Sequence, residues 1–278
     1  MFKNVLVGVD GRPNGRDAIV LAASLIDPDG KLTLAHVHSG ELHPVHAVTP
    51  GLVVEERKLS DDLLEQERAA ADVSAELLSI VAMSPGRGLH EQAEAQGADL
   101  LVVGSCSRGA FGRAMLGDDT RSALNGAPCA VAVATRGYAR HPTPIGKVGV
   151  AYNGSPESQA ALAKAQLLAA PTRAAVIALE VVSIPSYAFT GLIPPALGES
   201  IDLMLKEASV RMKALPDVAG RAVYGLAGEE LAAFGDEVDV LVVGSRSYGP
   251  VKRLVLGSTS DYLERHARCS LLVLPRAA

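Results

Sequence analysis

The stretch Asp239 to Ser260, DVLVVGSRSYGPVKRLVLGSTS, is the most informative part of this sequence for its fold. Its apolar run, residues 240–243, is typical of a strand that is buried on both faces of a parallel sheet. The run ends in a Gly/Ser loop, and a second Gly/Ser/Thr cluster follows where a helix is expected to begin. Glycines let the backbone approach a ligand closely, and the unpaired N–H groups of a helix start favour an anion. This layout predicts a phosphate site.

The same pattern occurs earlier, at Asp99 to Thr120, as DLLVVGSCSRGAFGRAMLGDDT. Three matched pairs have one common separation along the chain: Gly104 and Gly244, Gly117 and Gly257, and Cys129 and Cys269. The sequence is therefore a tandem duplication. We expect one domain over 1–137 and a second over 147–278, joined by a linker, 138–146, that holds two prolines and a glycine.

The composition supports two globular domains and argues against nucleic-acid binding. A chain of 278 residues suits two domains of about 100 to 200 residues each. It is 48% hydrophobic but only 4% aromatic, without Trp, so small aliphatic side chains must fill the interior and base stacking has little support. The net charge of −5 also argues against a broad basic surface for DNA or RNA.

The cysteines and the hydropathy pattern indicate a soluble cytoplasmic protein. Three cysteines cannot all pair, and none has metal-ligand spacing, which is simplest in a reducing compartment. The apolar pattern at the N-terminus stops at Asp10, too soon for a signal sequence. No segment approaches the roughly 20 apolar residues of a membrane span.

Strand and helix patterns alternate through both halves. In the first half strands are expected at 4–9, 31–38, 78–83, 100–103 and 129–134, with helices at 14–25, 55–75, 86–96 and 118–124. In the second half strands are expected at 148–152, 174–182, 222–224, 240–243 and 270–274, with helices at 156–168, 196–214, 226–234 and from 258. Such alternation predicts two tandem, doubly wound, five-stranded parallel α/β domains, with ligands at the carboxyl ends of the strands.

With these elements in order, the sequence resembles the universal stress protein family, specifically its tandem two-domain members. That resemblance implies a Rossmann-like fold of the adenine nucleotide alpha hydrolase type. The nucleotide-binding branch of the family has the pattern G-x2-G-x9-G followed by Ser or Thr, with an Asp after the first strand and a Val at the end of the second. Two occurrences at matched positions, each after D-[LV]-LVVGS, support the resemblance.

Carried over to the second half, the resemblance implies an ATP site, with ATP bound alone or with Mg. Asn153 stands where the family has its Asp, and so keeps an acceptor but loses the charge. Ser247 stands where the family has its second glycine, and the serine side chain narrows the loop. The implied nucleotide-binding residues are Asn153, Val181, Gly244, Ser245, Ser247, Gly257, Ser258, Thr259 and Ser260.

The first half departs from the family pattern differently. Its implied site residues are Asp10, Val37, Gly104, Ser107 and Gly117. The expected Ser or Thr after the last glycine is Asp118, followed by Asp119. Two carboxylates at a helix start already satisfy the helix dipole and would repel phosphate. Nucleotide is therefore expected in the second half rather than the first.

Other candidate residues have ordinary structural explanations beside the functional ones. His36, His38, His43 and His46 lie close together, but their spacing crosses a Gly and a Pro, so no metal site is predicted. Cys106 would sense oxidation if exposed near Arg108, whereas Cys129 and Cys269 open apolar strands and are expected in the core. The side chains of Lys252 and Arg253 would either bind phosphates or simply keep the loop exposed to solvent.

Three kinds of function stay open on the sequence. The first is a regulatory ATP-binding stress protein with no enzymatic activity beyond weak ATP hydrolysis, since no catalytic motif is present. The second is an interaction or scaffold module whose degenerate loops bind no nucleotide. The third is a nucleotide-activating enzyme, with any substrate pocket in the long loops 40–54 or 183–195.

The last strand of each half would be an exposed apolar edge unless something pairs with it. We therefore expect the two halves to pair through residues 129–134 and 270–274, and any larger assembly to be a homodimer. The protein partner and the sensed stress are not specified by the sequence.

Overall fold

The computed structural model describes residues 1–39, 50–105, 119–142, 144–183, 195–245, 253–254 and 257–276. The chain forms two compact units. The first unit comprises Met1–Pro144 with Arg246–Val255 and Leu272–Ala278, and the second comprises Ile145–Ser245 with Leu256–Leu271. Short segments of the second repeat are thus part of the first unit.

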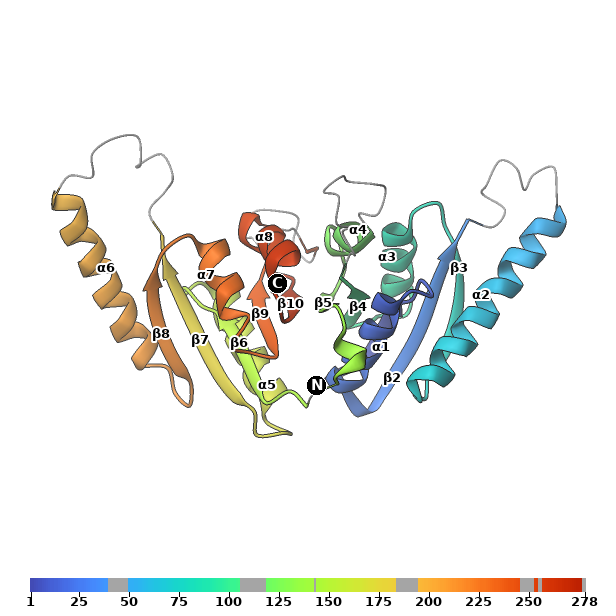
Figure 1. Ribbon diagram of the computed structural model, residues 1–278, viewed down its shortest axis with the longest axis horizontal. Coiled ribbons are helices and arrows are strands. Elements are labelled where there is room, and N and C mark those ends of the chain that lie inside the picture. Colours follow the sequence, from blue (N-terminus) through green and yellow to red (C-terminus); the bar gives the residue numbers. More distant parts are fainter. Residues whose placement is uncertain are drawn as a thin grey trace. The chain divides into compact units, whose positions relative to one another are not determined.

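Strands and helices alternate in the first half (Figure 1). The strands are β1 (Phe2–Gly8), β2 (Ile26–His38), β3 (Glu76–Val81), β4 (Leu100–Gly104) and β5 (Ala130–Ala134). The helices are α1 (Pro13–Leu25), α2 (Pro50–Ala71), α3 (Pro85–Ala95) and α4 (Asp119–Leu124), and a short 3-10 helix, η3 (Tyr138–Arg140), follows β5.

The second half repeats this order. Its strands are β6 (Lys147–Ala151), β7 (Ala175–Val182), β8 (Ala219–Tyr224), β9 (Val240–Gly244) and β10 (Ser270–Leu274). Its helices are α5 (Pro156–Ala169), α6 (Pro195–Lys213), α7 (Ala227–Phe234) and α8 (Ser258–His266).

Each half contains a five-stranded sheet, with strand order β3-β2-β1-β4-β5 in the first half and β10-β9-β6-β7-β8 in the second. The β1–β2, β1–β4, β6–β7 and β6–β9 pairings are all parallel. After β1 the chain forms β2 and β3 on one side of β1, and it then returns to form β4 and β5 on the other side. The second half does the same around β6. The strand order therefore reverses between β1 and β4 and between β6 and β9. The predicted doubly wound α/β fold is confirmed, and its ligand crevice is expected at these reversal points.

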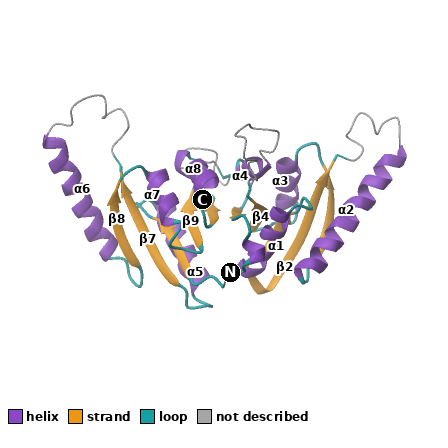
Figure 2. Ribbon diagram, viewed as in Figure 1, coloured by secondary structure: helices purple, strands orange, loops and turns teal. Residues whose placement is uncertain are grey.

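Helices cover the sheets as the crossover connections require (Figure 2). Helix α1 packs against α2 and α3 against α4, and in the second half α7 packs against α8 while α6 lies along β7 and β8. The strands beneath are apolar: all of β5 and the first four residues of β4, β9 and β10 are buried. Such burial on both faces explains the nearly continuous Ala, Val and Leu runs.

Element boundaries differ from the sequence-based ones mainly at two places. β2 begins at Ile26 rather than residue 31, because Phe2 already pairs with Ile26 ahead of a register shift. α2 begins at Pro50 rather than residue 55. Five of the helices in the described part of the chain begin with proline, whose fixed φ and missing N–H suit the first helical position: Pro13, Pro50, Pro85, Pro156 and Pro195.

The Asp that opens each repeated motif anchors a neighbouring strand. Asp99 accepts the backbone N–H groups of Lys3 and Asn4 at 2.8 and 2.9 Å, and Asp239 accepts those of Gly146 and Lys147, both at 2.8 Å. Each carboxylate therefore fixes the start of the first strand of its half beside the fourth. The repeated Asp therefore has a structural role in the sheet.

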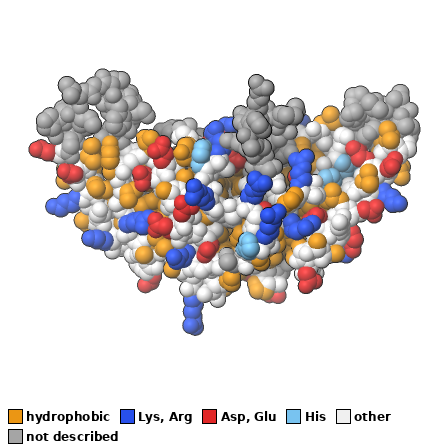
Figure 3. Space-filling model, viewed as in Figure 1, with side chains coloured by type: hydrophobic (Ala, Val, Ile, Leu, Met, Phe, Trp, Pro, Cys, Tyr) orange, Lys and Arg blue, Asp and Glu red, His pale blue; other side chains and the backbone are white. Residues whose placement is uncertain are grey.

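The surface carries charges of both signs. Acidic and basic side chains are interspersed over the face that Figure 3 shows. Among the described residues, no helix combines the length and the apolar character needed to cross a lipid bilayer.

Candidate nucleotide site

The turn after the first strand has the same design in both halves. In the second half Asn153 Oδ1 accepts the backbone N–H of Ser155 at 3.0 Å, and in the first half Asp10 Oδ1 accepts that of Arg12, also at 3.0 Å. Gly154 and Gly11 follow in the left-handed region, at φ +79° and +72°. The amide of Asn153 thus preserves the turn-forming acceptor of Asp10 without its charge.

The glycine at the end of the fourth strand allows a helix to approach closely. A Cβ on Gly104 would lie 2.2 Å from the backbone oxygen of Asn14 in α1. A Cβ on Gly244 would lie 2.8 Å from the Cβ of Glu157 in α5, and 3.0 Å from the Glu157 backbone oxygen. Both glycines are therefore required by strand–helix packing, whether or not a ligand binds.

Ser245 follows β9 directly and is 5% exposed. Its Oγ makes no hydrogen bond to any residue that the structure describes. Buried hydroxyl groups are nearly always hydrogen-bonded, so an unsatisfied one calls for a specific explanation. This hydroxyl lies where the sequence predicts phosphate.

Helix α8 begins on the other side of the second-half loop. Gly257 is its N-cap, with φ −83° and ψ 169°, and the first α-helical hydrogen bond runs from the N–H of Asp261 to the Gly257 oxygen at 2.9 Å. The N–H groups of Ser258, Thr259 and Ser260 therefore have no acceptor within the helix. Ser258 is exposed and Ser260 is buried.

The corresponding helix of the first half is shorter. α4 has six residues, and Thr120 Oγ1 donates to the backbone oxygen of Gly104 at 2.8 Å, which ties the helix start to β4. Ser107, Gly117 and Ser247, three of the predicted site residues, lie outside the described residues, as do Asp118, Cys106 and Lys252.

The two valines lie near the ends of the second strands. Val37 pairs in register with Ile80 of β3, and Val181 pairs with Val223 of β8. The described candidate residues of the second half lie at the carboxyl edge of one sheet. Each lies near the end of a strand, follows a strand or lies at the start of the helix that comes next: Asn153, Val181, Gly244–Ser245 and 257–260.

An ion pair beside this turn was not identified from the sequence. Arg211 of α6 donates to Glu180 of β7 through Nε at 3.1 Å and Nη2 at 2.7 Å. A Cβ on Gly154 would lie 3.7 Å from Arg211 Cδ. Because Arg211 and Glu180 are far apart in sequence and on different elements, no local motif marks them.

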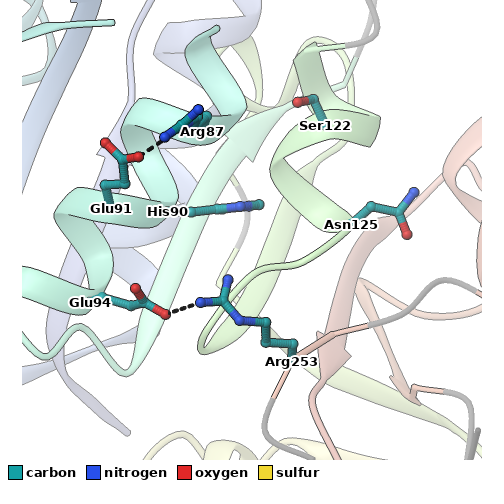
Figure 4. A pocket seen from close by; sticks show the side chains of 7 residues that line it. All are labelled: Arg87, His90, Glu91, Glu94, Ser122, Asn125 and Arg253. Carbon is teal, nitrogen blue, oxygen red and sulfur yellow. Dashed lines mark hydrogen bonds and ion pairs between the residues drawn. The ribbon is translucent and has the colours of Figure 1, made fainter. Parts of the chain in front are cut away.

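Arg253 contacts α3 and the segment that follows α4. It forms an ion pair with Glu94 of α3 and donates to the backbone oxygen of Gly126 at 3.1 Å. A hollow of about 400 Å³ lies beside this contact, lined by residues of α3 and α4 with Asn125 and Arg253 (Figure 4). The hollow contains none of the predicted nucleotide residues.

The histidines and cysteines of the described chain have structural contacts. His36 Nδ1 bonds to the backbone oxygen of Val9 at 2.7 Å, and His38 Nδ1 lies 3.5 Å from Glu56. Burial raises the pKa of the Cys129 and Cys269 thiols to about 12. His43 and His46 lie outside the described residues, and within those residues no group of three or more His, Cys, Asp or Glu side chains could hold a metal ion.

Comparison with known proteins agrees with this architecture. The model of the universal stress protein family matches residues 1–135 and again 144–275. The chain belongs to the universal stress protein family. Curated universal stress proteins of Mycobacterium bovis and Mycobacterium tuberculosis are each 31% identical over 186 residues, covering 63% of this chain and 61% of each relative, so the match spans less than two thirds of their length.

Solved universal stress proteins share the tandem fold. One from Archaeoglobus fulgidus has a TM-score of 0.67 at 17% identity, covering 99% of this chain and 98% of that chain. A protein from Pseudomonas aeruginosa described as a putative universal stress protein has a TM-score of 0.60 at 16% identity, covering 98% of this chain and 93% of its own. At these identities the likeness concerns the fold.

Proposed function

We propose that this universal stress protein is a cytoplasmic, non-enzymatic regulator that binds ATP in its second half. The observation that carries the proposal is the buried Oγ of Ser245, which has no partner among the described residues. A phosphate oxygen at the end of β9 would accept its hydrogen bond. Family membership supports an adenine nucleotide there.

The start of α8 supports the same assignment. Three successive N–H groups, at 258–260, precede the first intrahelical hydrogen bond, and the dipole of a helix favours negative charge at this end. The hydroxyls of Ser258 and Thr259 add donors beside them. Asn153, Val181, Gly244, Ser247 and Gly257 complete the proposed site.

We propose weaker binding in the first half because of its charge. Asp118 and Asp119 stand where the second half has Ser258 and Thr259. A like-charge contact with a phosphate oxygen at about 4 Å costs roughly 1 kcal/mol or more in a partly screened site. Asp10 adds a third carboxylate that the second half lacks.

A second candidate function is an interaction module that binds no nucleotide. The packing of Gly244 against α5 favours it, because this packing explains the first motif glycine without a ligand. In either case we propose that the halves pair through β5 and β10, and that any larger assembly is a homodimer.

Replacing Ser258 with Asp separates the two candidates. Ser258 is exposed at the first position of α8, where Asp favours the helix, so the fold should tolerate the change. If phosphate binds there, calorimetric titration should show ATP affinity reduced at least about tenfold. Ala163→Asp adds the same charge at an exposed position within α5 and should leave ATP affinity unchanged.

Equal ATP affinity in the wild type and Ser258→Asp would contradict the proposed phosphate site. Absence of any ATP binding to the wild type, together with no nucleotide in mass spectra of freshly purified protein, would favour the interaction module instead.

A further inference from the structure

The two halves place different charged side chains at matched positions beside the turn that follows their first strand. In the second half the cation is Arg211, near the end of the crossover helix α6, and its Cδ lies 3.7 Å from where a Cβ on Gly154 would be. Gly154 directly follows Asn153. The guanidinium therefore belongs to the carboxyl edge of β6, next to the proposed nucleotide site.

Arg211 is held by Glu180 and remains half exposed, and the carboxylate of Glu207 also acts on its charge. Glu180, whose side chain is 8% exposed, accepts hydrogen bonds from Nε and Nη2, whereas the Arg211 side chain is 46% exposed. Nη1 makes no hydrogen bond to the described residues. The hydrogen bond to Glu180, followed by the charge of Glu180, raises the pKa of Arg211, which stays protonated.

In the first half the crossover helix carries an acidic residue at the position matched to Arg211. His36 occupies the place of Glu180 on the second strand and bonds to the Val9 oxygen. The crossover helix α2 carries Glu67, whose side chain is 5% exposed, and this carboxylate pairs with Arg16 of α1 at 2.7 Å. Both halves thus have an ion pair of a buried Glu with a half-exposed Arg. The crossover helix supplies the Glu of this pair in the first half and the Arg in the second. The first half also has the Asp10 carboxylate where the second has the Asn153 amide.

The place of Arg211 can be compared with that of ribose-binding residues in doubly wound nucleotide-binding folds. There a carboxylate binds the free ribose hydroxyls, and a nearby arginine accommodates a phosphate on the ribose. In the second half the predicted phosphate loop follows β9 and Val181 is the last residue but one of β7, with β6 between β9 and β7. A nucleotide that spans from the predicted phosphate loop to Val181 would cross the turn after β6, and its ribose would then lie beside Arg211.

We propose that the second half selects adenine nucleotides with an additional phosphate on the ribose, at the 2′ or 3′ position, and that Arg211 binds this phosphate. The proposal rests on the proposed nucleotide site and specifies its ligand. Bidentate or charge-assisted contacts from arginine to phosphate are among the strongest polar contacts in proteins.

The test compares four ligands by calorimetric titration into the full chain: ATP, AMP, adenosine 2′,5′-bisphosphate and adenosine 3′,5′-bisphosphate. At least one bisphosphate should bind about tenfold more tightly than AMP, or better. The position that gives the greater gain identifies the ribose hydroxyl that faces Arg211.

Variants of Arg211 and Glu180 test whether this ion pair causes the preference for a bisphosphate over AMP. Arg211→Gln alone would leave Glu180 buried and unpaired, so it is combined with Glu180→Gln, which keeps the volume and removes both charges. The double variant should lose the preference, with the affinity ratio of bisphosphate to AMP falling to about 1, while Arg211→Lys should retain part of it. The matched double variant in the first half, Arg16→Gln with Glu67→Gln, should retain all of it.

The outcomes separate this proposal from the one on which it rests. If AMP and ATP bind but neither bisphosphate binds more tightly, or if the preference survives in the Arg211 and Glu180 double variant, the ribose-phosphate assignment is wrong and the nucleotide site stands. If none of these nucleotides binds, both proposals are wrong.

Discussion

At the scale of single residues, Asp17 connects α1 to the segment that follows β5. It is 2% exposed, and its two oxygens accept the backbone N–H groups of Gly137 at 2.8 Å and Ala139 at 2.7 Å. Asp17→Asn weakens both charge-assisted bonds and should lower the free energy of unfolding by about 2 kcal/mol.

Denaturant unfolding measures this change, with Asp62→Asn as the control. Asp62 is exposed on α2, and its substitution should change stability by less than about 0.5 kcal/mol. Equal effects of the two substitutions would mean that the Asp17 bonds do not stabilise the first unit.

Individual residues also show where sequence reasoning was sufficient and where it was not. The repeated Gly, Ser and Asp residues predicted the duplication and the loops, because each belongs to a short local motif. Arg211 and Glu180 could not be predicted, because their contact depends on how α6 crosses β7. The roles of Asp99 and Asp239 could not be predicted either, since the backbone N–H groups that they bind lie at the first strand of each half, far away in sequence.

At the scale of elements, the packing of α1 on β4 and of α5 on β9 predicts unequal losses of stability when the two matched glycines are replaced by alanine. Gly104→Ala directs a methyl group onto a backbone oxygen at 2.2 Å and should cost about 3 kcal/mol, whereas Gly244→Ala meets its nearest atoms at 2.8 and 3.0 Å and should cost about 1 kcal/mol. Thermal or denaturant unfolding of both variants checks the order.

Gly51→Ala is the control for these substitutions. Gly51 lies in α2 with nothing within 4 Å of an added Cβ, so alanine should stabilise the helix by up to about 1 kcal/mol. A smaller loss for Gly104→Ala than for Gly244→Ala would contradict the packing described for β4 and α1.

A buried cysteine precedes the last strand of each half, and its titration makes the stability of the protein depend on pH in the alkaline range. Burial raises the pKa of Cys129 and Cys269 from 9.0 to about 12, so above pH 9 the unfolded chain loses these protons first. Stability should therefore fall as pH rises from 9 toward 12, by up to about 1.4 kcal/mol per pH unit for each thiol.

The double variant Cys129→Ala with Cys269→Ala lacks both thiols and should lose less stability over this range. The difference in unfolding free energy between wild type and double variant is measured at a series of pH values. A difference that stays constant from pH 8 to 11 would show that these thiols titrate normally in the folded protein.

Strand and helix types were predicted well at this scale, because buried parallel strands and proline helix starts have clear sequence patterns. The start of β2 was missed, since residues 26–30 contain Asp-Pro-Asp-Gly, which is typical of a turn. Pairing of Phe2 with Ile26 outweighs that local preference.

At the scale of the whole molecule, the second repeat contributes residues to the first unit. The N–H of Leu254 donates to the Ala127 oxygen, and the N–H of Gly126 donates to the Leu254 oxygen, both at 2.9 Å. Leu254→Pro removes the first bond directly and should increase hydrogen exchange at the Gly126 amide, whereas Leu254→Ala keeps both backbone bonds and should increase it less. Equal exchange in the two variants would exclude this backbone pairing as a source of protection.

The duplication also gives the chain two unlike versions of one nucleotide site, and this difference is the central claim. Native mass spectrometry of the full chain in the presence of ATP counts bound nucleotides directly. At an ATP concentration close to the Kd of the wild type, we predict one ATP per chain, largely lost in Ser258→Asp and retained in Ala163→Asp. Two ATP molecules per chain, or one that persists in Ser258→Asp, would contradict the claim that the second half is the nucleotide-binding half.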